Sequence, residues 1–128
     1  MNSSNALFEI QYGLQPDYLH ARVSAERIER TTWQSLLSDV LMECARHRRK
    51  KLLLERVNAG DVPQSELQDM MADLLKLNDT TQIAFLNRHL LMADEIADVV
   101  AYGANMGGNY RCFSSVEAAE RWLLEDQV

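Results

Sequence analysis

The chain has 128 residues, of which 47% are hydrophobic and 25% are charged, and these values are ordinary for a single globular domain. A domain of this length is expected to bury about two thirds of the surface that its unfolded chain exposes. No apolar run approaches the roughly 20 residues of a membrane-spanning helix, and residues 1–5 lack the charge and apolar segment of a signal peptide.

The net charge of −6 disfavours general binding to nucleic acids. The charge is uneven, because five of the 13 Lys and Arg residues lie between Arg46 and Lys51. These cations are expected at a helix C-terminus, where the last carbonyls favour positive charge, and a patch for acidic partners or phosphates is the alternative. Cys44 and Cys112 show no CxxC or zinc spacing, which predicts buried thiols in a reduced, cytoplasmic protein.

Two alternating segments open the predicted fold. Residues 7–12 and residues 17–23 each place apolar side chains on one face and polar side chains on the other. The residues between them, 13–16, contain Gly and Pro and predict a turn. This pattern indicates an antiparallel hairpin at the edge of a sheet, in which His20 is an exposed strand residue.

An amphipathic helix is predicted next. Thr31 and Gln34 form a capping box, and an apolar stripe follows at helical spacing. The stripe consists of Trp33, Leu36, Leu37, Val40, Leu41 and Cys44. It is expected to face the core, because residues 51–57 contain three consecutive leucines between charged residues, which is typical of a strand buried on both faces.

The rest of the chain alternates helices and strands. Strands are predicted over residues 81–86 and 110–113, one helix over residues 90–106, and another from a capping box of Ser114 and Glu117. Before residue 81, a further helix is predicted from an apolar stripe that consists of Leu67, Met70, Met71, Leu74 and Leu75. Packing of this stripe against the core is favoured over an adaptable binding face.

These elements predict one domain over residues 1–128, with residues 1–5 and 126–128 as frayed tails. The expected order is β-β-α-β-α-β-α-β-α. It corresponds to the α/β class, with a single five-stranded mixed sheet in which parallel strands follow the antiparallel hairpin, and with about four packed helices.

The carboxyl ends of parallel strands are the usual place for a ligand in such a sheet. Here those ends carry Glu55, Arg56, Asn87 and Arg88, which predict a groove for a ligand or partner and an ion pair, partly exposed, between Glu55 and Arg56 or Arg88. The alternative is that strand ends are polar because the chain leaves the core there. Glu55 and His89 are the one candidate acid/base pair in the sequence. The sequence has no phosphate-binding glycine loop and no nucleophile elbow. We therefore predict no enzyme activity, metal or cofactor.

The arrangement resembles the STAS and SEC14-like superfamily, the fold of bacterial anti-sigma-factor antagonists, and is most similar to that superfamily's uncharacterised bacterial branch. The resemblance is carried by the hairpin at residues 8–23, the strands at 51–55 and 82–86, and the ending at 110–123. That ending is the most specific part, because a short strand leads into a capped helix that closes on Ala-Glu-Arg-Trp-Leu.

The resemblance implies a non-enzymatic, cytoplasmic binding or regulatory module that acts through protein–protein interaction, with an unknown protein or a second copy as its partner. Other branches imply a small or lipid-like ligand between helices and sheet as the alternative. Nucleic acid, a membrane span and cofactors are not expected. Signalling members carry Asp-Ser-Ser-Gly after the third strand, where a kinase phosphorylates a serine. Ser65 is the only serine near that place and lacks those neighbours, so a polar residue in the first turn of a helix is the alternative to a phosphorylation site.

Overall fold

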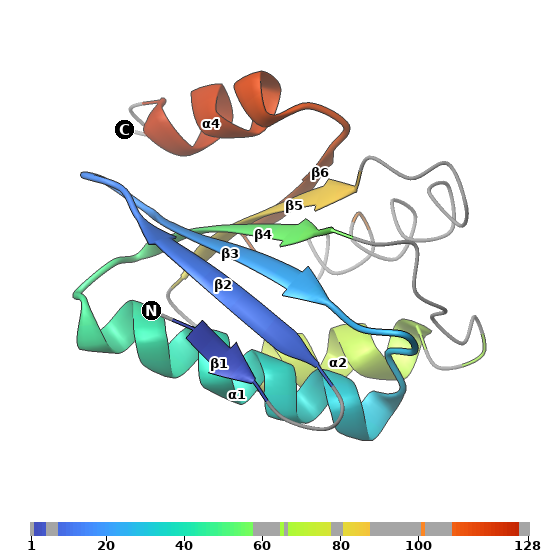
Figure 1. Ribbon diagram of the computed structural model, residues 1–128. Helices are drawn as coiled ribbons and strands as arrows, with labels where there is room; N and C mark the ends of the chain where they lie inside the picture. Colours follow the sequence, from blue (N-terminus) through green and yellow to red (C-terminus); the bar gives the residue numbers. More distant parts are fainter. Residues whose placement is uncertain are drawn as a thin grey trace.

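The computed structural model describes residues 2–4, 8–57, 65, 67–77, 81–87, 101 and 109–125. These residues form one six-stranded mixed sheet with helices on both faces (Figure 1). The strands lie across the sheet in chain order, as β1 (Asn2–Ser4), β2 (Glu9–Leu14), β3 (Leu19–Ser24), β4 (Lys51–Arg56), β5 (Gln82–Asn87) and β6 (Tyr110–Phe113). The first three strands are antiparallel, and β3 to β6 are parallel, which confirms the predicted α/β fold with its opening hairpin.

A sixth strand extends the sheet beyond the five that were predicted. Residues 1–5 were expected to be frayed, but Asn2–Ser4 pairs antiparallel with β2, and Ser3 lies opposite Ile10. The sequence of β1 has no alternating apolar pattern. An edge strand is held by backbone hydrogen bonds to its one neighbour, so it does not need apolar side chains that would reveal it.

The turn of the hairpin also lies two residues later than predicted. Gly13 and Leu14 belong to β2, and the turn is made by Gln15 to Tyr18. The backbone N–H of Gln15 donates to the carbonyl of Tyr18 at 2.9 Å. Pro16 occupies the second position of this turn, where its fixed φ angle is favourable.

Two helices cover one face of the sheet, which we call the α1–α2 face (Figure 1). They are α1 (Arg30–Arg46) and α2 (Leu67–Leu77). The stripes that were predicted for these helices pack here, because the core contains Leu36, Leu37, Val40, Met70, Met71 and Leu74 together with Ile10, Leu19, Ala21, Val23, Leu52, Leu54 and Ile83 of the strands.

The third described helix, α4 (Val116–Leu124), packs over β4, β5 and β6 on the opposite face. This second core contains Tyr18, Leu53, Ala84, Leu86, Ala119 and Leu123. Leu52 and Leu54 point toward α1 and α2, whereas Leu53 points toward α4, so the predicted burial of β4 on both faces is confirmed. Of the helix predicted over residues 90–106, only Ala101 is described, and it is helical.

The helix starts differ from the predicted capping boxes by two residues in α1 and by one residue in α4. The N-cap of α1 is Glu29 rather than Thr31, and its side chain makes no capping hydrogen bond. The N-cap of α4 is Ser115 rather than Ser114, and its hydroxyl accepts a hydrogen bond from the backbone N–H three residues later at 3.3 Å. Gln34 makes a tertiary contact instead of a capping one, and sequence spacing alone does not reveal such a contact.

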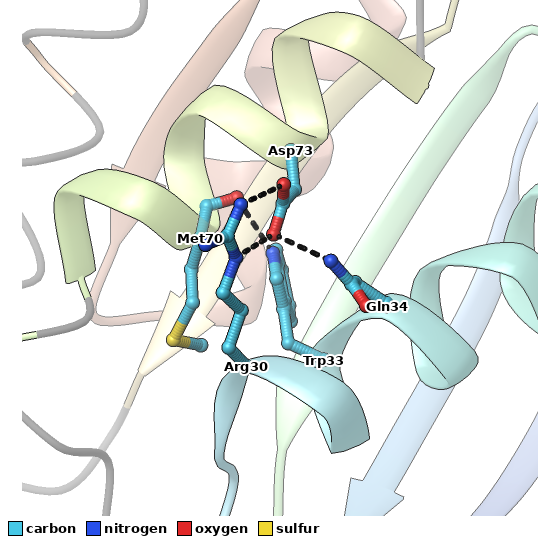
Figure 2. Close-up of polar contacts among 5 residues, drawn as sticks. All are labelled: Arg30, Trp33, Gln34, Met70 and Asp73. Carbon is cyan, nitrogen blue, oxygen red and sulfur yellow. Dashed lines mark hydrogen bonds and ion pairs between the residues drawn. The ribbon is translucent and has the colours of Figure 1, made fainter.

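A polar clamp joins α1 to α2 (Figure 2). The Arg30 guanidinium donates to both carboxylate oxygens of Asp73, at 2.9 and 3.0 Å, and Gln34 donates to one of them at 3.2 Å. The Trp33 indole N–H donates to the backbone carbonyl of Met70 at 2.7 Å. The hydrogen bond from Arg30 lowers the pKa of Asp73. These contacts fix the two helices against each other above the core.

Candidate functional site

The predicted groove residues do not all lie on one face of the sheet. Side chains alternate along a strand, so Glu55 lies on the α4 side and Arg56 on the α1–α2 side. Asn87 is the register partner of Arg56, but its side chain lies outside the described residues, as does the whole of Arg88. The parallel pairing of β4 with β5, on which the groove prediction depended, is confirmed.

Glu55 is a buried carboxylate, and its side chain is only 7% exposed. Its Oε1 atom lies 2.8 Å from Nε2 of His20 and 3.8 Å from Nε of Arg22. We expected a partly exposed ion pair with Arg56 or Arg88. The partners described here come from β3, which runs parallel to β4 with Arg22 opposite Glu55, while the pairing with Arg88 lies outside the described residues and stays a prediction. A carboxylate at this depth requires such partners to offset the loss of hydration.

His20 is not the exposed strand residue that was predicted, since its side chain is only 18% exposed. It lies opposite Leu53 in the β3–β4 register, so its ring reaches Glu55 two residues farther along. The sequence did contain a signal for this pair. A carboxylate that ends a buried apolar run needs a partner, and the alternating residues of the neighbouring strand are the nearest source.

Around this pair lies a surface that we call the polar sheet face, made of Gln11, Gly13, His20, Arg22 and Glu55. In the β2–β3 register, Gln11 lies opposite Arg22 and Gly13 opposite His20. Gln11 is exposed, and the Arg22 side chain is 49% exposed. A Cβ atom placed at Gly13 would lie 3.7 Å from Nε2 of Gln15 and 3.9 Å from Cβ of His20, which is ordinary van der Waals contact.

The two sides of β2 and β3 therefore differ sharply. Their α1–α2 side is mostly apolar and covered, for example at Ile10, Leu19 and Ala21, which have no exposed area. Beside the polar sheet face, the Tyr18 hydroxyl donates to Oε2 of Glu120 at 2.7 Å and so joins the β2–β3 turn to α4. Burial and this hydrogen bond raise the pKa of Tyr18 to about 12, so the hydroxyl remains a donor.

The polar sheet face contains a group that can transfer protons, and the two thiols lie elsewhere. A histidine held by a carboxylate can transfer a proton, but a covalent step also needs a nucleophile. Both thiols pack with the α1–α2 core, and burial raises the pKa to about 12 for Cys44 and about 11 for Cys112. Thiols with such pKa values are weak nucleophiles near neutral pH. His89, the acid/base partner considered for Glu55, lies outside the described residues.

Two other features of the described residues bear on the site. In that part of the chain, no group of three or more His, Cys, Asp or Glu residues could hold a metal ion. Ser65 is exposed in a short helical turn shortly before α2, a position open to solvent whether or not the residue is modified. The loop that precedes it in the sequence lies outside the described residues.

No family model matches the sequence, and no curated protein does. Solved structures do match. One is an uncharacterized protein from the DUF3478 family with a SpoIIAA-like fold, from Shewanella loihica PV-4. It superposes with a TM-score of 0.55 at 15% sequence identity, over 96% of this chain and 98% of that one. The fold of this chain is SpoIIAA-like. The STAS-type resemblance that the sequence suggested is thus confirmed for the fold, and at 15% identity the match carries no partner or ligand over to this chain.

Within the SpoIIAA-like fold, none of the described helices has both the length and the apolar character needed to cross a membrane. The longest of them, α1, has 17 residues and carries charged side chains on its outer side.

Proposed function

We propose that this chain is a non-enzymatic, cytoplasmic binding module whose polar sheet face contacts a protein partner. One observation carries the proposal. Strands β2 and β3 are mostly apolar and buried on one side but polar and partly open on the other, where buried Glu55 holds His20 beside an exposed Arg22. Small-molecule sites are concave and mostly apolar, whereas an exposed arginine on a rigid scaffold is typical of protein interfaces.

The cysteines support both the non-enzymatic role and the location. Cys44 and Cys112 are free thiols, as expected in a reducing compartment, and neither lies at the polar sheet face. We also propose that Ser65 is not a phosphorylation switch, because the Asp-Ser-Ser-Gly stretch is absent around it. A stoichiometric phosphate on Ser65 of protein isolated from its host would overturn that part of the proposal.

Site-specific photocrosslinking in the native host tests the proposed surface. A photoreactive amino acid replaces Gln11, at the exposed margin of the polar sheet face, and in a control it replaces Met42. Met42 is 67% exposed on α1, in the layer on the opposite side of the sheet. We expect a discrete protein adduct from position 11 and none of the same mass from position 42. An adduct from position 42 alone would refute the proposed surface, and an adduct of twice the chain mass would identify the partner as a second copy.

A small ligand between the helices and the sheet is the second candidate, and one observation favours it. The Tyr12 hydroxyl is buried on the α1–α2 face without a hydrogen-bond partner among the described residues. Burial and the nearby charges of Asp39 and Glu43 raise its pKa, so it remains a neutral donor. A polar group of a ligand, or a water molecule, would satisfy it.

A further inference from the structure

The segment that links α1 to β4 carries a concentration of positive charge. Five of the 13 Lys and Arg residues fall within its six residues, although the whole chain has a net charge of −6. We call Arg46, Arg48, Arg49, Lys50 and Lys51 the basic segment. Arg46, Arg48 and Lys50 are exposed, and Lys51 is partly exposed. The segment was predicted at a helix C-terminus, and α1 does end at Arg46.

Only some side chains of the basic segment form hydrogen bonds or ion pairs with other described residues. Glu43 pairs with Arg46 at 3.2 Å and with His47 at 3.2 Å. Arg49 donates to the backbone carbonyls of Gln15 and His47, at 3.1 and 3.0 Å, and forms no ion pair with a carboxylate among the described residues. The side chains of Arg48 and Lys50 make no hydrogen bond or ion pair within the described part of the chain.

The backbone holds these side chains on a rigid frame. The N–H of Arg48 donates to the carbonyl of Ala45, and the N–H of Arg49 donates to the carbonyl of Cys44, at 3.1 and 2.8 Å. This pair of bonds is the Schellman arrangement that ends many helices. Together with the Arg49 bond to Gln15, it fixes the basic segment against the β2–β3 turn.

Arg48 occupies an unfavourable position for its residue type. Its φ angle is +56°, and it is the one non-glycine residue with positive φ among those described. The Schellman arrangement places its left-handed residue here, and glycine fills that position most often because a Cβ atom is disfavoured. No hydrogen bond or ion pair of the Arg48 side chain within the described residues offsets this cost, and a local cost of this kind is typical of functional positions.

We propose that the basic segment is a second interaction surface, and that it binds an acidic peptide segment of a partner protein. Arg48 and Lys50 supply the recognition charges, and Arg49 and the Schellman arrangement hold them in place. The segment covers one helix end, which is too short to follow a nucleic acid backbone, and the net charge of −6 opposes broad contact with nucleic acids or anionic membranes. A run of carboxylates matches both the charge and the length. This surface is separate from the polar sheet face and does not depend on it.

The test measures binding of a fluorescently labelled oligoglutamate peptide to the full chain by anisotropy. We expect the double variant Arg48→Ser/Lys50→Ser to bind about five-fold more weakly than the wild type, because it loses two exposed charge contacts. The control is Arg27→Ser/Arg121→Ser, which removes two exposed arginines elsewhere and changes the net charge equally. It should bind within two-fold of the wild type. Binding should also weaken between about 0.1 M and about 1 M salt, where the screening length falls from about 10 Å to about 3 Å.

A single variant separates binding from folding. Arg48→Gly should raise the melting temperature by a few degrees, since glycine favours the left-handed position, while it weakens peptide binding. The proposal is overturned if the wild type does not bind the peptide, or if the Arg48/Lys50 variant binds as tightly as the control. It is also overturned if vesicles of phosphatidylserine and phosphatidylcholine bind in an Arg48-dependent way and the peptide does not, which would assign the surface to a membrane.

Discussion

His20 and Glu55 are separated by 35 residues in the chain, yet Nε2 of the first lies 2.8 Å from Oε1 of the second. Their meeting depends on the parallel register of β3 and β4, in which Arg22 stands opposite Glu55. The pair is the buried part of the polar sheet face, and Arg22 is its exposed cation. The proposed binding surface therefore depends on the same strand pairing that forms the centre of the fold.

The two partners of Glu55 should contribute unequally to stability. His20→Ala should lower the free energy of unfolding by about 1–3 kcal/mol, because a buried carboxylate loses a short hydrogen bond. Arg22→Ala should cost less than about 1 kcal/mol, because its atoms are 3.8 Å away and its side chain is half exposed. Urea unfolding of both variants checks this order. Equal losses would mean that Arg22 is part of the structural anchor and is not free to bind a partner.

Leu53 tests the two-sided burial of β4. It has no exposed area and lies in the core under α4, so Leu53→Asp should remove several kcal/mol of stability by placing a carboxylate in an apolar layer. The matched control is Leu14→Asp, since Leu14 is also a strand leucine but is 43% exposed. Thermal melting of the two variants should differ widely. Similar melting temperatures would contradict the placement of α4 over this strand.

The α1–α2 clamp should make part of the stability dependent on pH. The pKa of Asp73 is lowered by its hydrogen bond from Arg30, so the stabilising contribution is fully present above the unfolded-state value of about 3.9. It is lost as the pH falls below that value and through the lowered folded-state pKa. Asp73→Asn should cost about 1–2 kcal/mol at neutral pH, because Arg30 remains partly exposed to water.

Denaturant titrations at a series of pH values compare this variant with the wild type. The difference in unfolding free energy should shrink toward zero in acid. A difference that stays constant down to the lowest pH would show that the carboxylate charge does not contribute to the clamp. Gln34→Ala is a useful companion, since it removes only the 3.2 Å bond to Asp73 and leaves the ion pair with Arg30 in place.

The Tyr12→Phe variant tests whether the Tyr12 hydroxyl lacks a hydrogen-bond partner or is hydrogen-bonded to a ligand. Its hydroxyl is buried without a hydrogen-bond partner among the described residues, so Tyr12→Phe should leave stability unchanged or raise it by about 1 kcal/mol. Melting of purified protein provides the measurement. A loss of more than about 1 kcal/mol would indicate that the hydroxyl is hydrogen-bonded in solution, and would favour the small-ligand alternative over the protein partner.

The sequence predicted the buried layers of this fold well. The three leucines of β4 form a continuous apolar run and the stripe of α1 has helical spacing, so both patterns can be read directly from the residue types. Edge strand β1 escaped detection because its pairing uses backbone groups, which every residue carries. The start of α1 was misplaced because Gln34, read as a capping residue, contacts Asp73 on another helix.

The candidate site was harder to predict than the fold. Glu55 was identified correctly as a polar residue at a strand end, and its expected partner was Arg56 or Arg88. Alternation places Arg56 on the opposite face, Arg88 lies outside the described residues, and the ion pairs that are described come from β3, which the sequence shows only as an alternating segment. Strand order and register, rather than residue type, decide which side chains meet, and a single sequence does not state them.

Native mass spectrometry of the protein isolated from its host tests the central claim most directly. We predict a complex with a defined protein partner, or with a second copy, that disappears in the charge-reversal variant Arg22→Glu. It should persist in Arg27→Glu, which reverses an exposed arginine outside the polar sheet face. A single chain that retains a small molecule in all three proteins, or a complex that survives Arg22→Glu unchanged, would contradict partner binding at this face.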